Sequence, residues 1–443
     1  MGPPQIRVII AGAGIAGLCL AIFLERAGID YVVLERGESL KALGSTMTLS
    51  AQVLRVFDQL GLLEDLQKIG LPLAGFKYYD KEMNEVGRMG MIVDNGPFES
   101  ELMEFLQTQV PKDKIHWGKR ILSTMQNKEG VMCRCSDSSC YDGDILVGAD
   151  GAYSAVRQSM QHNMKLKNLH VPESDMAPLR FTEFSILGVT EPLEDLPMPV
   201  SEDKQGTFML TILPKEEGDL FVYVIALEGM RLGWRLAGQF LSAQVQSEEN
   251  FRFSEWGSDD INVLVKDLSD RTAPIVGTVG KLFDSTKQIS RIMLEEKKFD
   301  IWYEGRTVLM GDACHKMLPS GGQGANQAIY DAVCLANLLY ELPSNSVRDI
   351  KKVFARYYAL RKPYTDSMID GSAKFSRLLG ATGFFASLVR KVFFHYIPES
   401  VRVKRADAMF SARPILNFLG DFPLKGTVPD TSLPMTLKDP VAI

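Results

Sequence analysis

The sequence predicts an α/β fold in three parts: a domain around a mostly parallel sheet, an antiparallel sheet inserted into that domain, and a helical C-terminal region. Three observations lead to this prediction. A glycine-rich turn joins a short β-branched run to an apolar helix near the N-terminus, alternating apolar patterns begin near Met176, and helical spacing dominates after Tyr340. With 443 residues, the chain is long enough for two or three domains.

Composition and charge narrow the class of protein. Hydrophobic residues make up 46% of the chain, enough for extensive cores, and the formal net charge is -6. Because no long basic run is present, nucleic acid is not an expected partner. The six cysteines are scattered rather than spaced as a disulfide framework, and we find no signal peptide and no apolar run of transmembrane length. We therefore expect a reducing, cytoplasmic setting.

The first element is a βαβ unit, in which a strand, a glycine-rich turn, an apolar helix and a second strand follow one another from Arg7 to Leu34. In its GxGxxG turn, Gly12 permits the tight bend, Gly14 lets the backbone approach a pyrophosphate, and Gly17 lets helix and strand pack closely. Glu35 follows the second strand, where a carboxylate binds ribose hydroxyls and would repel a 2′-phosphate. The unit therefore predicts a site for FAD or NAD.

Short helices and strands are expected between this unit and a second motif. Helical spacing occurs at residues 52–62, 63–69 and 102–110, and strand patterns occur at 76–91, 115–119, 131–135 and 141–147. The second motif is GADGAYSAVR, in which an apolar strand ends in Asp150-Gly151 and a helix begins near Ser154. Asp150 stands where a second acid could meet the dinucleotide, and the alternative is a plain Asp-Gly turn.

The third motif is the stretch Val308–Asn326, VLMGDACHKMLPSGGQGAN. A short buried strand leads into a glycine-rich loop that can approach a ligand closely, and the helix that begins at Ala325 favours negative charge at its N-terminus. Asp312, after the strand, can accept hydrogen bonds from hydroxyl groups. Because the carboxyl ends of parallel strands converge on one crevice, the three motifs together predict a long dinucleotide with a redox ring.

An antiparallel sheet is expected between the second and third motifs. Strand patterns occur at residues 179–189, 206–213 and 220–227, and helical spacing follows from Leu236 to about Lys287. Such a sheet offers one apolar face that can cover a pocket. The predicted domains are a discontinuous dinucleotide-binding domain (1–75, 98–175 and 290–345), a substrate domain (76–97 and 176–289) and a helical C-terminal region (346–443) with a Pro/Gly-rich stretch at 413–427.

The apolar run nearest to transmembrane length, Leu378–Val389, lies in the C-terminal region between Arg377 and the pair Arg390-Lys391. It is too short to cross a bilayer, but a helix of this kind can lie on a membrane surface. A helix packed against the protein is the favoured alternative. Peripheral membrane contact through residues 378–405 is therefore one of two interpretations.

The three motifs as a set resemble those of FAD-dependent monooxygenases related to the aromatic hydroxylases. The match is closest to fungal secondary-metabolite enzymes that epoxidise or hydroxylate prenylated substrates, and it spans roughly residues 6–345. The resemblance implies a Rossmann-type FAD-binding domain of the p-hydroxybenzoate-hydroxylase kind. It also implies FAD as cofactor, NAD(P)H and O2 as co-substrates, and no metal. Relatives have no separate NAD(P)H domain, and this chain likewise shows one GxGxxG motif.

The resemblance also implies roles for individual residues. Asp150 and Arg157 would lie near the FAD pyrophosphate and help in handling NAD(P)H, Asp312 would bind the ribitol chain or pyrophosphate, and the backbone at Gly324–Asn326 would face the flavin ring. The helix start at Ala325 would stabilise the anionic reduced flavin, whose hydroperoxide delivers one oxygen atom. The candidate cofactor-binding residues are Gly12, Gly14, Ala16, Gly17, Glu35, Arg36, Thr48, Arg120, Asp150, Arg157, Asp312, Pro319, Gly322, Gly324, Ala325 and Asn326.

One departure from the family pattern concerns the charge opposite the FAD phosphates. Relatives usually carry an Arg at the start of the helix that precedes the strand at residue 115, and this sequence has Glu99 or Ser100 there. We therefore expect either weaker FAD retention or compensation by Lys41 or Arg120.

The expected substrate is hydrophobic, either isoprenoid or aromatic, because the inserted sheet is rich in apolar and aromatic side chains. Arg180 and Tyr223 are candidate catalytic residues that would position it, although a structural role in a strand is favoured for each. His315 could shuttle a proton, but a structural place in the loop is again favoured. Two alternative functions stay open, a flavin-dependent prenyl reductase and an FAD-binding protein with little turnover.

Overall fold

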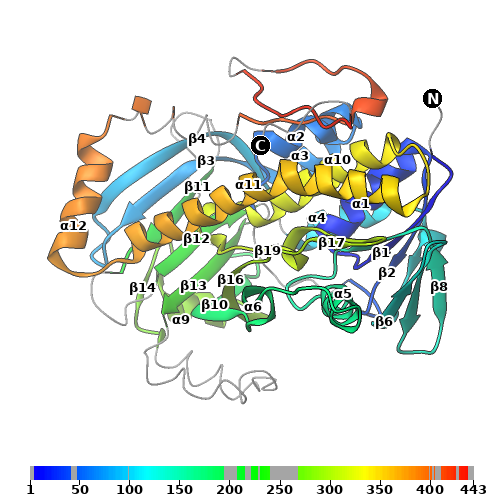
Figure 1. The fold of residues 1–443 in the computed structure, drawn as a ribbon. Helices are drawn as coiled ribbons and strands as arrows, with labels where there is room; N and C mark the ends of the chain where they lie inside the picture. The colour runs from blue at the N-terminus through cyan, green and yellow to red at the C-terminus, as the bar shows by residue number, and fades with distance from the viewer. Residues whose placement is uncertain are drawn as a thin grey trace.

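A computed structural model describes residues 4–40, 47–97, 99–193, 207–214, 221–227, 230–239, 268–398, 400–401, 404, 411–425 and 429–437. Two sheet-containing halves lie side by side, and the long helix α11 (Val347–Gly380) runs from one half to the other (Figure 1). Lys41, one of the two residues expected to compensate the phosphate charge, lies outside the described residues.

The first half is built on a six-stranded sheet with the order β17-β18-β9-β1-β2-β5. Every neighbouring pair is parallel except β17 and β18. The strands are β1 (Arg7–Ala11), β2 (Asp30–Leu34), β5 (Ile115–His116), β9 (Ile145–Gly148), β17 (Tyr303–Glu304) and β18 (Thr307–Leu309). Because β1, β9 and β18 are neighbours, the three motifs that follow them leave the same edge of the sheet, as the sequence predicts.

Helices α1 and α10, which follow the first and third motifs, pack against each other. The adjacent strand β1 is buried on both faces, which explains its continuous β-branched run. A three-stranded sheet of β6, β7 and β8 packs on α5. The elements are α1 (Ile15–Ala27), α2 (Ala51–Gln59), α3 (Leu63–Lys68), α4 (Glu99–Thr108), α5 (Ala155–Leu166), α10 (Gly324–Tyr340), β6 (Ile121–Gln126), β7 (Val131–Cys135) and β8 (Cys140–Gly143).

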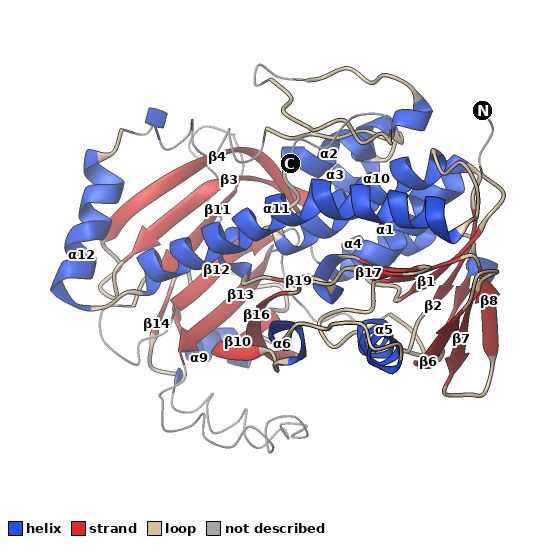
Figure 2. Ribbon diagram, in the orientation of Figure 1, coloured by secondary structure: helices blue, strands red, loops and turns tan. Residues whose placement is uncertain are grey.

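The second half is an eight-stranded sheet with the order β19-β16-β10-β13-β12-β11-β3-β4, seen on the left of Figure 2. All pairs are antiparallel except β11 with β3. The expected inserted antiparallel sheet is therefore present. Its strands are β3 (Gly70–Tyr79), β4 (Glu85–Pro97), β10 (Arg180–Val189), β11 (Thr207–Ile212), β12 (Phe221–Leu227), β13 (Arg231–Gln239), β16 (Ile289–Lys298) and β19 (His315–Lys316).

Some sequence boundaries for this sheet were wrong. Strand β3 begins at Gly70 and β16 reaches Lys298, so the sheet extends beyond the expected limits of 76 and 289. The helical spacing expected from Leu236 is also wrong at its start, because β13 continues to Gln239. Leu232, Trp234 and Leu236 are all buried, and this period of two is that of a strand. Helix α9 (Val279–Asp284) follows, and residues 240–267 lie outside the described part.

The two faces of the eight-stranded sheet have separate apolar cores. One face packs on α9 through Val222, Val224 and Trp234. The opposite face packs on α11, on the third motif and on the turn after α12, and its core contains Tyr78, Leu213, Phe221, Ala237, Leu294, Leu318, Leu379 and Phe394. The sheet face that carries Phe221 is therefore the one that adjoins the predicted cofactor loop.

The C-terminal region is helical only in part. After α11 come α12 (Gly383–Lys391) and a π-helical turn, η5 (Val392–Tyr396). Within the expected helical region 346–443, residues 411–425 and 429–437 contain only the short η6 (Asn417–Leu419), and they include the expected Pro/Gly-rich stretch as far as residue 425. These residues form an extended strap across α2, α10 and α11, which is bound by Arg55 and Arg356. No helix among the described residues combines the length and apolar character needed to cross a membrane.

Candidate active site

The glycine-rich turn after β1 is packed too tightly for side chains at two of its glycines. Gly12 has a φ of 103°, and a Cβ on it would lie 2.5 Å from the carbonyl oxygen of Ala149 at the end of β9. A Cβ on Gly17 would lie 1.9 Å from the carbonyl oxygen of Gly12. Both glycines are therefore required for the close approach of α1 to the sheet edge.

Gly14 is different, because no atom lies within 4 Å of a Cβ added there. It precedes α1, which has no side-chain cap and no acidic residue in its first turn. The Glu35 carboxylate lies beside this turn and accepts hydrogen bonds of 2.8 Å from the backbone N–H groups of Ala13 and Gly37. It therefore braces the turn, and its contact with a ribose stays a prediction.

In the second motif, the Asp150 carboxylate binds the start of its own helix. It accepts hydrogen bonds from the Ser154 hydroxyl at 2.5 Å and from the Ala155 N–H at 2.7 Å. Burial raises the pKa of Asp150, and these hydrogen bonds oppose that effect. The contacts match the plain-turn alternative, so a contact of Asp150 with the dinucleotide stays a prediction.

Arg157 connects the second motif to the third. Its guanidinium is buried and donates hydrogen bonds of 2.7 Å to the carbonyl oxygens of Ala313 and Ala152. The same group lies 3.9 Å from the centre of the Phe299 ring. These contacts fix the loop after β18, and the role of Arg157 near the FAD pyrophosphate and in handling NAD(P)H stays a prediction.

The third motif brings the starts of α1 and α10 together. Gly311 has a φ of 59°, and a Cβ on it would lie 3.3 Å from the Ala16 side chain and 3.4 Å from that of Ala328. Asp312, which follows, is half-buried and accepts a hydrogen bond from the Lys316 ammonium at 2.5 Å. Ala16, a candidate cofactor-binding residue, thus lies at the contact between two motifs, and its contact with the cofactor stays a prediction.

Asn326 holds the segment around Thr48 against the glycine loop. Its amide group donates hydrogen bonds of 2.8 Å to the carbonyl oxygens of Thr48 and Gly322, and its oxygen accepts one of 2.9 Å from the Ser50 N–H. Gly322 has a φ of 61°, and a Cβ on it would lie 2.7 Å from the Thr48 hydroxyl. Thr48 is therefore brought to Gly322 and Asn326 at the start of α10, although it lies far from both in the sequence.

A buried ion-pair cluster beneath this loop was missed by sequence reasoning. Asp331 lies 2.6 Å from the His315 ring nitrogen and accepts hydrogen bonds from Arg361 at 2.7 Å and from the Gly311 N–H at 2.9 Å. Burial alone would raise the pKa of Asp331, but His315 and Arg361 hold it at about 2. The favoured structural place of His315 agrees with these contacts. The sequence signal for this cluster was Asp331, a charged residue within the apolar helix α10.

The same cluster does not fit a metal ion, although Cys314, His315 and Asp331 have donor atoms within 4.8 Å of one another. Both carboxylate oxygens of Asp331 are already bonded, and the Arg361 cation lies against them. A second cation there would be repelled.

The remaining candidate residues lie on the margins of the site. Tyr223 is half-buried, stacks on Phe221 with ring centres 5.7 Å apart and packs against the core that contains Leu318. Arg180 begins β10 opposite Glu296 in the β10–β16 ladder. Arg36 and Arg120 are exposed, and α4 begins at Glu99 and packs on α1. The catalytic roles of Arg180 and Tyr223 stay predictions.

Comparison with known proteins identifies the family. Residues 5–371 match the family model described as FAD binding domain. The chain belongs to this family. This flavoprotein is 32% identical over 424 residues to the FAD-dependent monooxygenase ptmM of Penicillium ochrochloron, covering 90% of this chain and 94% of that one. It is 33% identical over 424 residues to penM of Penicillium crustosum, covering 90% and 84%.

Solved structures share the fold of the flavoprotein. Klebsiella pneumoniae HpxO complexed with FAD and uric acid has a TM-score of 0.72 and 21% identity, with 91% of this chain and 96% of that one covered. A salicylate hydroxylase substrate complex has a TM-score of 0.67 and 19% identity, with 93% and 99% covered. The relatives and the family model establish an FAD-dependent monooxygenase that uses NAD(P)H and O2.

The residues present fit FAD. Helices α1 and α10 both begin without a side-chain cap and without an acidic residue in the first turn, so each presents N–H groups and a positive dipole end to an anion. At Gly14 and at Gly324, no atom lies within 4 Å of an added Cβ, so a ligand can reach the backbone at both places. Bound FAD supplies the redox chemistry, and these residues hold and orient it.

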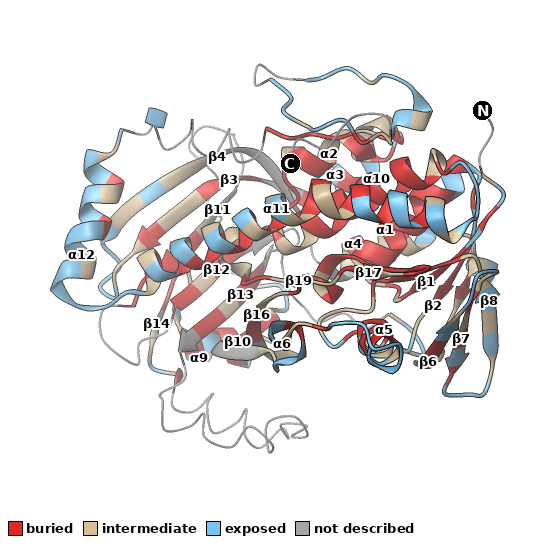
Figure 3. Ribbon diagram, viewed as in Figure 1, coloured by how far each residue is buried: buried red, intermediate tan, exposed pale blue. Residues whose placement is uncertain are grey.

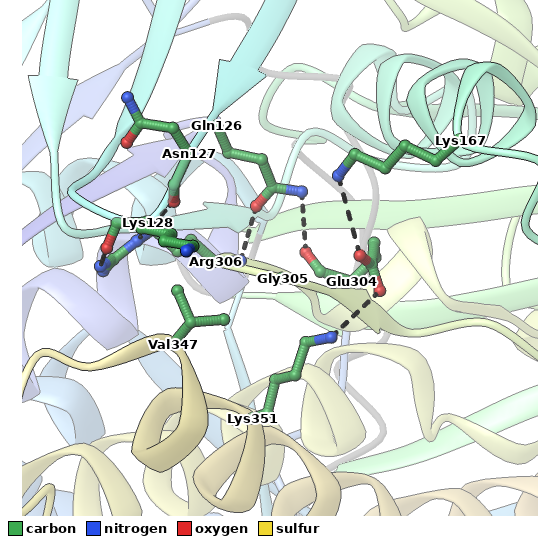
Figure 4. Close-up of a pocket in the computed structure, with 9 residues that line it drawn as sticks. All are labelled: Gln126, Asn127, Lys128, Lys167, Glu304, Gly305, Arg306, Val347 and Lys351. Atoms are coloured by element: carbon green, nitrogen blue, oxygen red, sulfur yellow. Dashed lines mark hydrogen bonds and ion pairs between the residues drawn. The ribbon is translucent and has the colours of Figure 1, made fainter.

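A polar cavity of about 220 Å³ lies beside Gly305, just before β18 (Figure 4). The three motifs, in contrast, follow the carboxyl ends of β1, β9 and β18. Glu304 at its wall lies 3.8 Å from the ammonium groups of both Lys167 and Lys351. Gln126 and Arg306 line it and are bonded to one another through the Arg306 N–H. The cavity is therefore separate from the flavin site.

Proposed function

We propose that this monooxygenase acts on a hydrophobic aromatic or isoprenoid small molecule by hydroxylation or epoxidation. One oxygen atom of O2 enters the product, and the other leaves as water with two electrons from NAD(P)H. The apolar core that contains both Leu318 and Phe221 carries the proposal, because it joins the loop before Pro319 to the aromatic face of the inserted sheet. An apolar surface beside the glycine-rich loop of the third motif suits an apolar substrate.

We propose the following roles for the untested site residues. The open backbone at Gly14 and the start of α1 bind the pyrophosphate, and Glu35 binds the adenosine ribose. The start of α10 at Gly324 faces the flavin ring, and Asp312 binds the ribitol chain. The exposed Arg36 and Arg120 supply phosphate charge in place of the Arg that the sequence lacks at Glu99–Ser100.

We propose that Tyr223 positions the substrate, with Arg180 in the same role on β10. Tyr223→Phe should raise the KM for substrate and divert reducing equivalents to peroxide, while the FAD content stays unchanged. Tyr141→Phe is a matched control, because Tyr141 is also half-buried but lies on β8 of the small sheet. Equal effects of both changes would argue against a substrate role.

The decisive experiment is oxygen transfer from labelled O2. Purified protein should be yellow, and NADPH and O2 consumption should rise with aromatic or isoprenoid compounds. The product should gain one labelled oxygen, whereas a prenyl reductase would add two hydrogens and no label. Colourless protein that takes up no added FAD would overturn the assignment of the site. The relatives named above are monooxygenases, and none of them supports the reductase alternative.

We also propose peripheral contact with a membrane surface through residues 378–405. The described part of this segment carries highly exposed apolar side chains on α12, and residues 399, 402, 403 and 405 lie outside the described part. Such a contact suits an enzyme whose substrate dissolves in lipid.

A further inference from the structure

Helix α12, together with the first residue of η5, exposes an apolar face composed of Phe384, Phe385, Leu388, Val389 and Val392. Phe384 and Phe385 are 79% and 80% exposed, and the other three are also exposed. The five positions follow the spacing i, i+1, i+4, i+5 and i+8, so they share one side of the helix. Figure 3 shows α12 as a largely exposed helix at the end of the molecule. Isolated exposed apolar residues are ordinary, but a continuous face marks an interaction site.

Arg390, in the last turn of α12, points inward and fixes the orientation of the helix. Its side chain is 4% exposed, in contrast to the neighbouring Lys391. The guanidinium donates hydrogen bonds to the carbonyl oxygens of Leu379, at 3.0 Å, and of Ala381. These carbonyls lie at the C-terminus of α11, where a cation is stabilised by the helix dipole. Turning the apolar face inward would break these bonds and leave the carbonyls unsatisfied.

The turn after α12 is anchored to the sheet by Phe394. Its ring is buried, with its centre 5.0 Å from that of Tyr78. Gly87 on β4 leaves room for this ring, because a Cβ there would lie 2.3 Å from it. Arg390 and Phe394 thus hold the helix from its inner side, and the apolar face is a fixed feature of the folded protein.

Charge favours an anionic partner for this face. No Asp or Glu occurs between Asp370 and Glu399, whereas that stretch contains the exposed Lys374, Arg377 and Lys391. The chain as a whole has a formal net charge of -6, so this basic stretch stands out. Lys391 is exposed and adjoins the apolar face in the last turn of α12. Anionic lipids attract basic residues of this kind at a membrane surface.

We propose that the apolar face of α12 inserts into the interface of a bilayer that contains anionic lipids, with Lys391 at the level of the headgroups. This rests on the proposed membrane contact and names the lipid class and the inserted residues. A second copy of the chain is the less suitable occupant. Stable protein interfaces use about 20 to 30 residues on each side, whereas this face offers five side chains.

Vesicle flotation tests the proposal with the full-length holoprotein. The probes are phosphatidylcholine vesicles with and without phosphatidylserine, at low and at high salt. The protein should float with the anionic vesicles, and high salt should weaken the binding. Phe384→Asp with Phe385→Asp should lower the bound fraction at least about tenfold. Lys391→Glu should lower binding to the anionic vesicles only.

The matched control is Leu122→Asp with Met125→Asp on β6. These side chains are 59% and 61% exposed, and β6 lies at the opposite end of the molecule from α12 (Figure 1). The control should float like the unchanged protein. An equal loss in both double variants would overturn the proposal, as would no flotation of the unchanged protein. A dimer in light scattering that only the α12 variant dissociates, without vesicle binding, would identify a second copy as the occupant.

Failure of docking and failure of the proposed oxygenase activity give different results. Flotation requires no turnover, and FAD absorbance with NADPH oxidation in buffer reports the flavin site without vesicles. The α12 variant should keep both flavin readouts, because its residues lie outside the flavin site. Active enzyme that does not float would overturn only the docking proposal.

Discussion

The guanidinium of Arg361 on α11 lies 2.7 Å from a carboxylate oxygen of Asp331 on α10, and both side chains are at most 2% exposed. Arg361 also donates a hydrogen bond of 2.7 Å to the Gln327 side chain and lies 3.9 Å from the centre of the Tyr330 ring. The other oxygen of Asp331 binds the Gly311 N–H of the third motif. Helix α10, which starts at the third motif, is thus joined to α11, which ends beside α12.

Breaking this pair should strongly destabilise the protein. Arg361→Met leaves the Asp331 carboxylate buried without its cation, at a cost of about 3 to 5 kcal/mol in the free energy of unfolding. Urea unfolding measures the effect. Lys352→Met is the control, because Lys352 forms an exposed pair with Asp349, and it should leave the midpoint unchanged. The double variant Asp331→Asn with Arg361→Met should lose less than the sum of the single changes.

The same carboxylate predicts a pH dependence. The pKa of Asp331 in the folded protein is about 2, below its ordinary value of 3.8. A carboxyl group whose pKa is lowered by folding stabilises the folded state at pH values above its ordinary pKa. This stabilisation is lost as the pH falls from about 4 to 2. The stability advantage of the unchanged protein over Asp331→Asn should therefore shrink by about 2 kcal/mol over that range. An advantage that does not change with pH would contradict the charge pairing.

Two glycines of the first motif should respond in opposite ways to a side chain. Gly14→Val should fold normally, because the space is open, but it should raise the Kd for FAD at least about tenfold by blocking the pyrophosphate. Gly17→Ala should fail to fold stably, because its Cβ would lie 1.9 Å from a carbonyl oxygen. Circular dichroism and FAD titration separate the two effects. Unchanged FAD affinity in Gly14→Val would place the pyrophosphate elsewhere.

Restoring a cation at the start of α4 should tighten FAD binding. Ser100→Arg or Glu99→Arg adds positive charge where the resemblance to the family leads us to expect an Arg, and α4 packs on α1, which begins at the first glycine-rich turn. A charge-assisted contact is worth about 1.5 to 3 kcal/mol, which corresponds to about a tenfold or larger fall in Kd. Fluorescence quenching of FAD measures the change. Glu104→Arg, one turn further along α4, controls for net charge. No tightening at 99 or 100 would count against this phosphate position.

The convergence of the three motifs was predictable because each motif carries its own local signal. A strand, a turn residue and a helix start occur together at Gly12, Asp150 and Asp312, and parallel strands bring their ends to one edge. The neighbour relation of β1, β9 and β18 follows from the fold class. No such local signal marks the partner of Asp331, because Arg361 lies on another helix and 30 residues away.

The sequence predicted the wrong element where helix and strand patterns look alike. Helical spacing was expected from Leu236, although Leu232, Trp234 and Leu236 occupy every second position of β13 and are all buried. The inward position of Arg390 was equally hidden, because sequence periodicity shows which residues share a helix face but not which face is covered. The carbonyl groups that bind Arg390 belong to the preceding helix, and only the tertiary structure brings them together.

The strap of residues 411–425 and 429–437 has a consequence for the order of events during synthesis. Ala412, Leu416 and Met435 belong to the same core as β1 and α1, and Arg55 on α2 binds Asp430 at 2.6 Å. The first half of the protein therefore cannot close its core until residue 435 has left the ribosome. Until then the unfinished core exposes apolar surface, and such surface makes incompletely folded chains prone to aggregation.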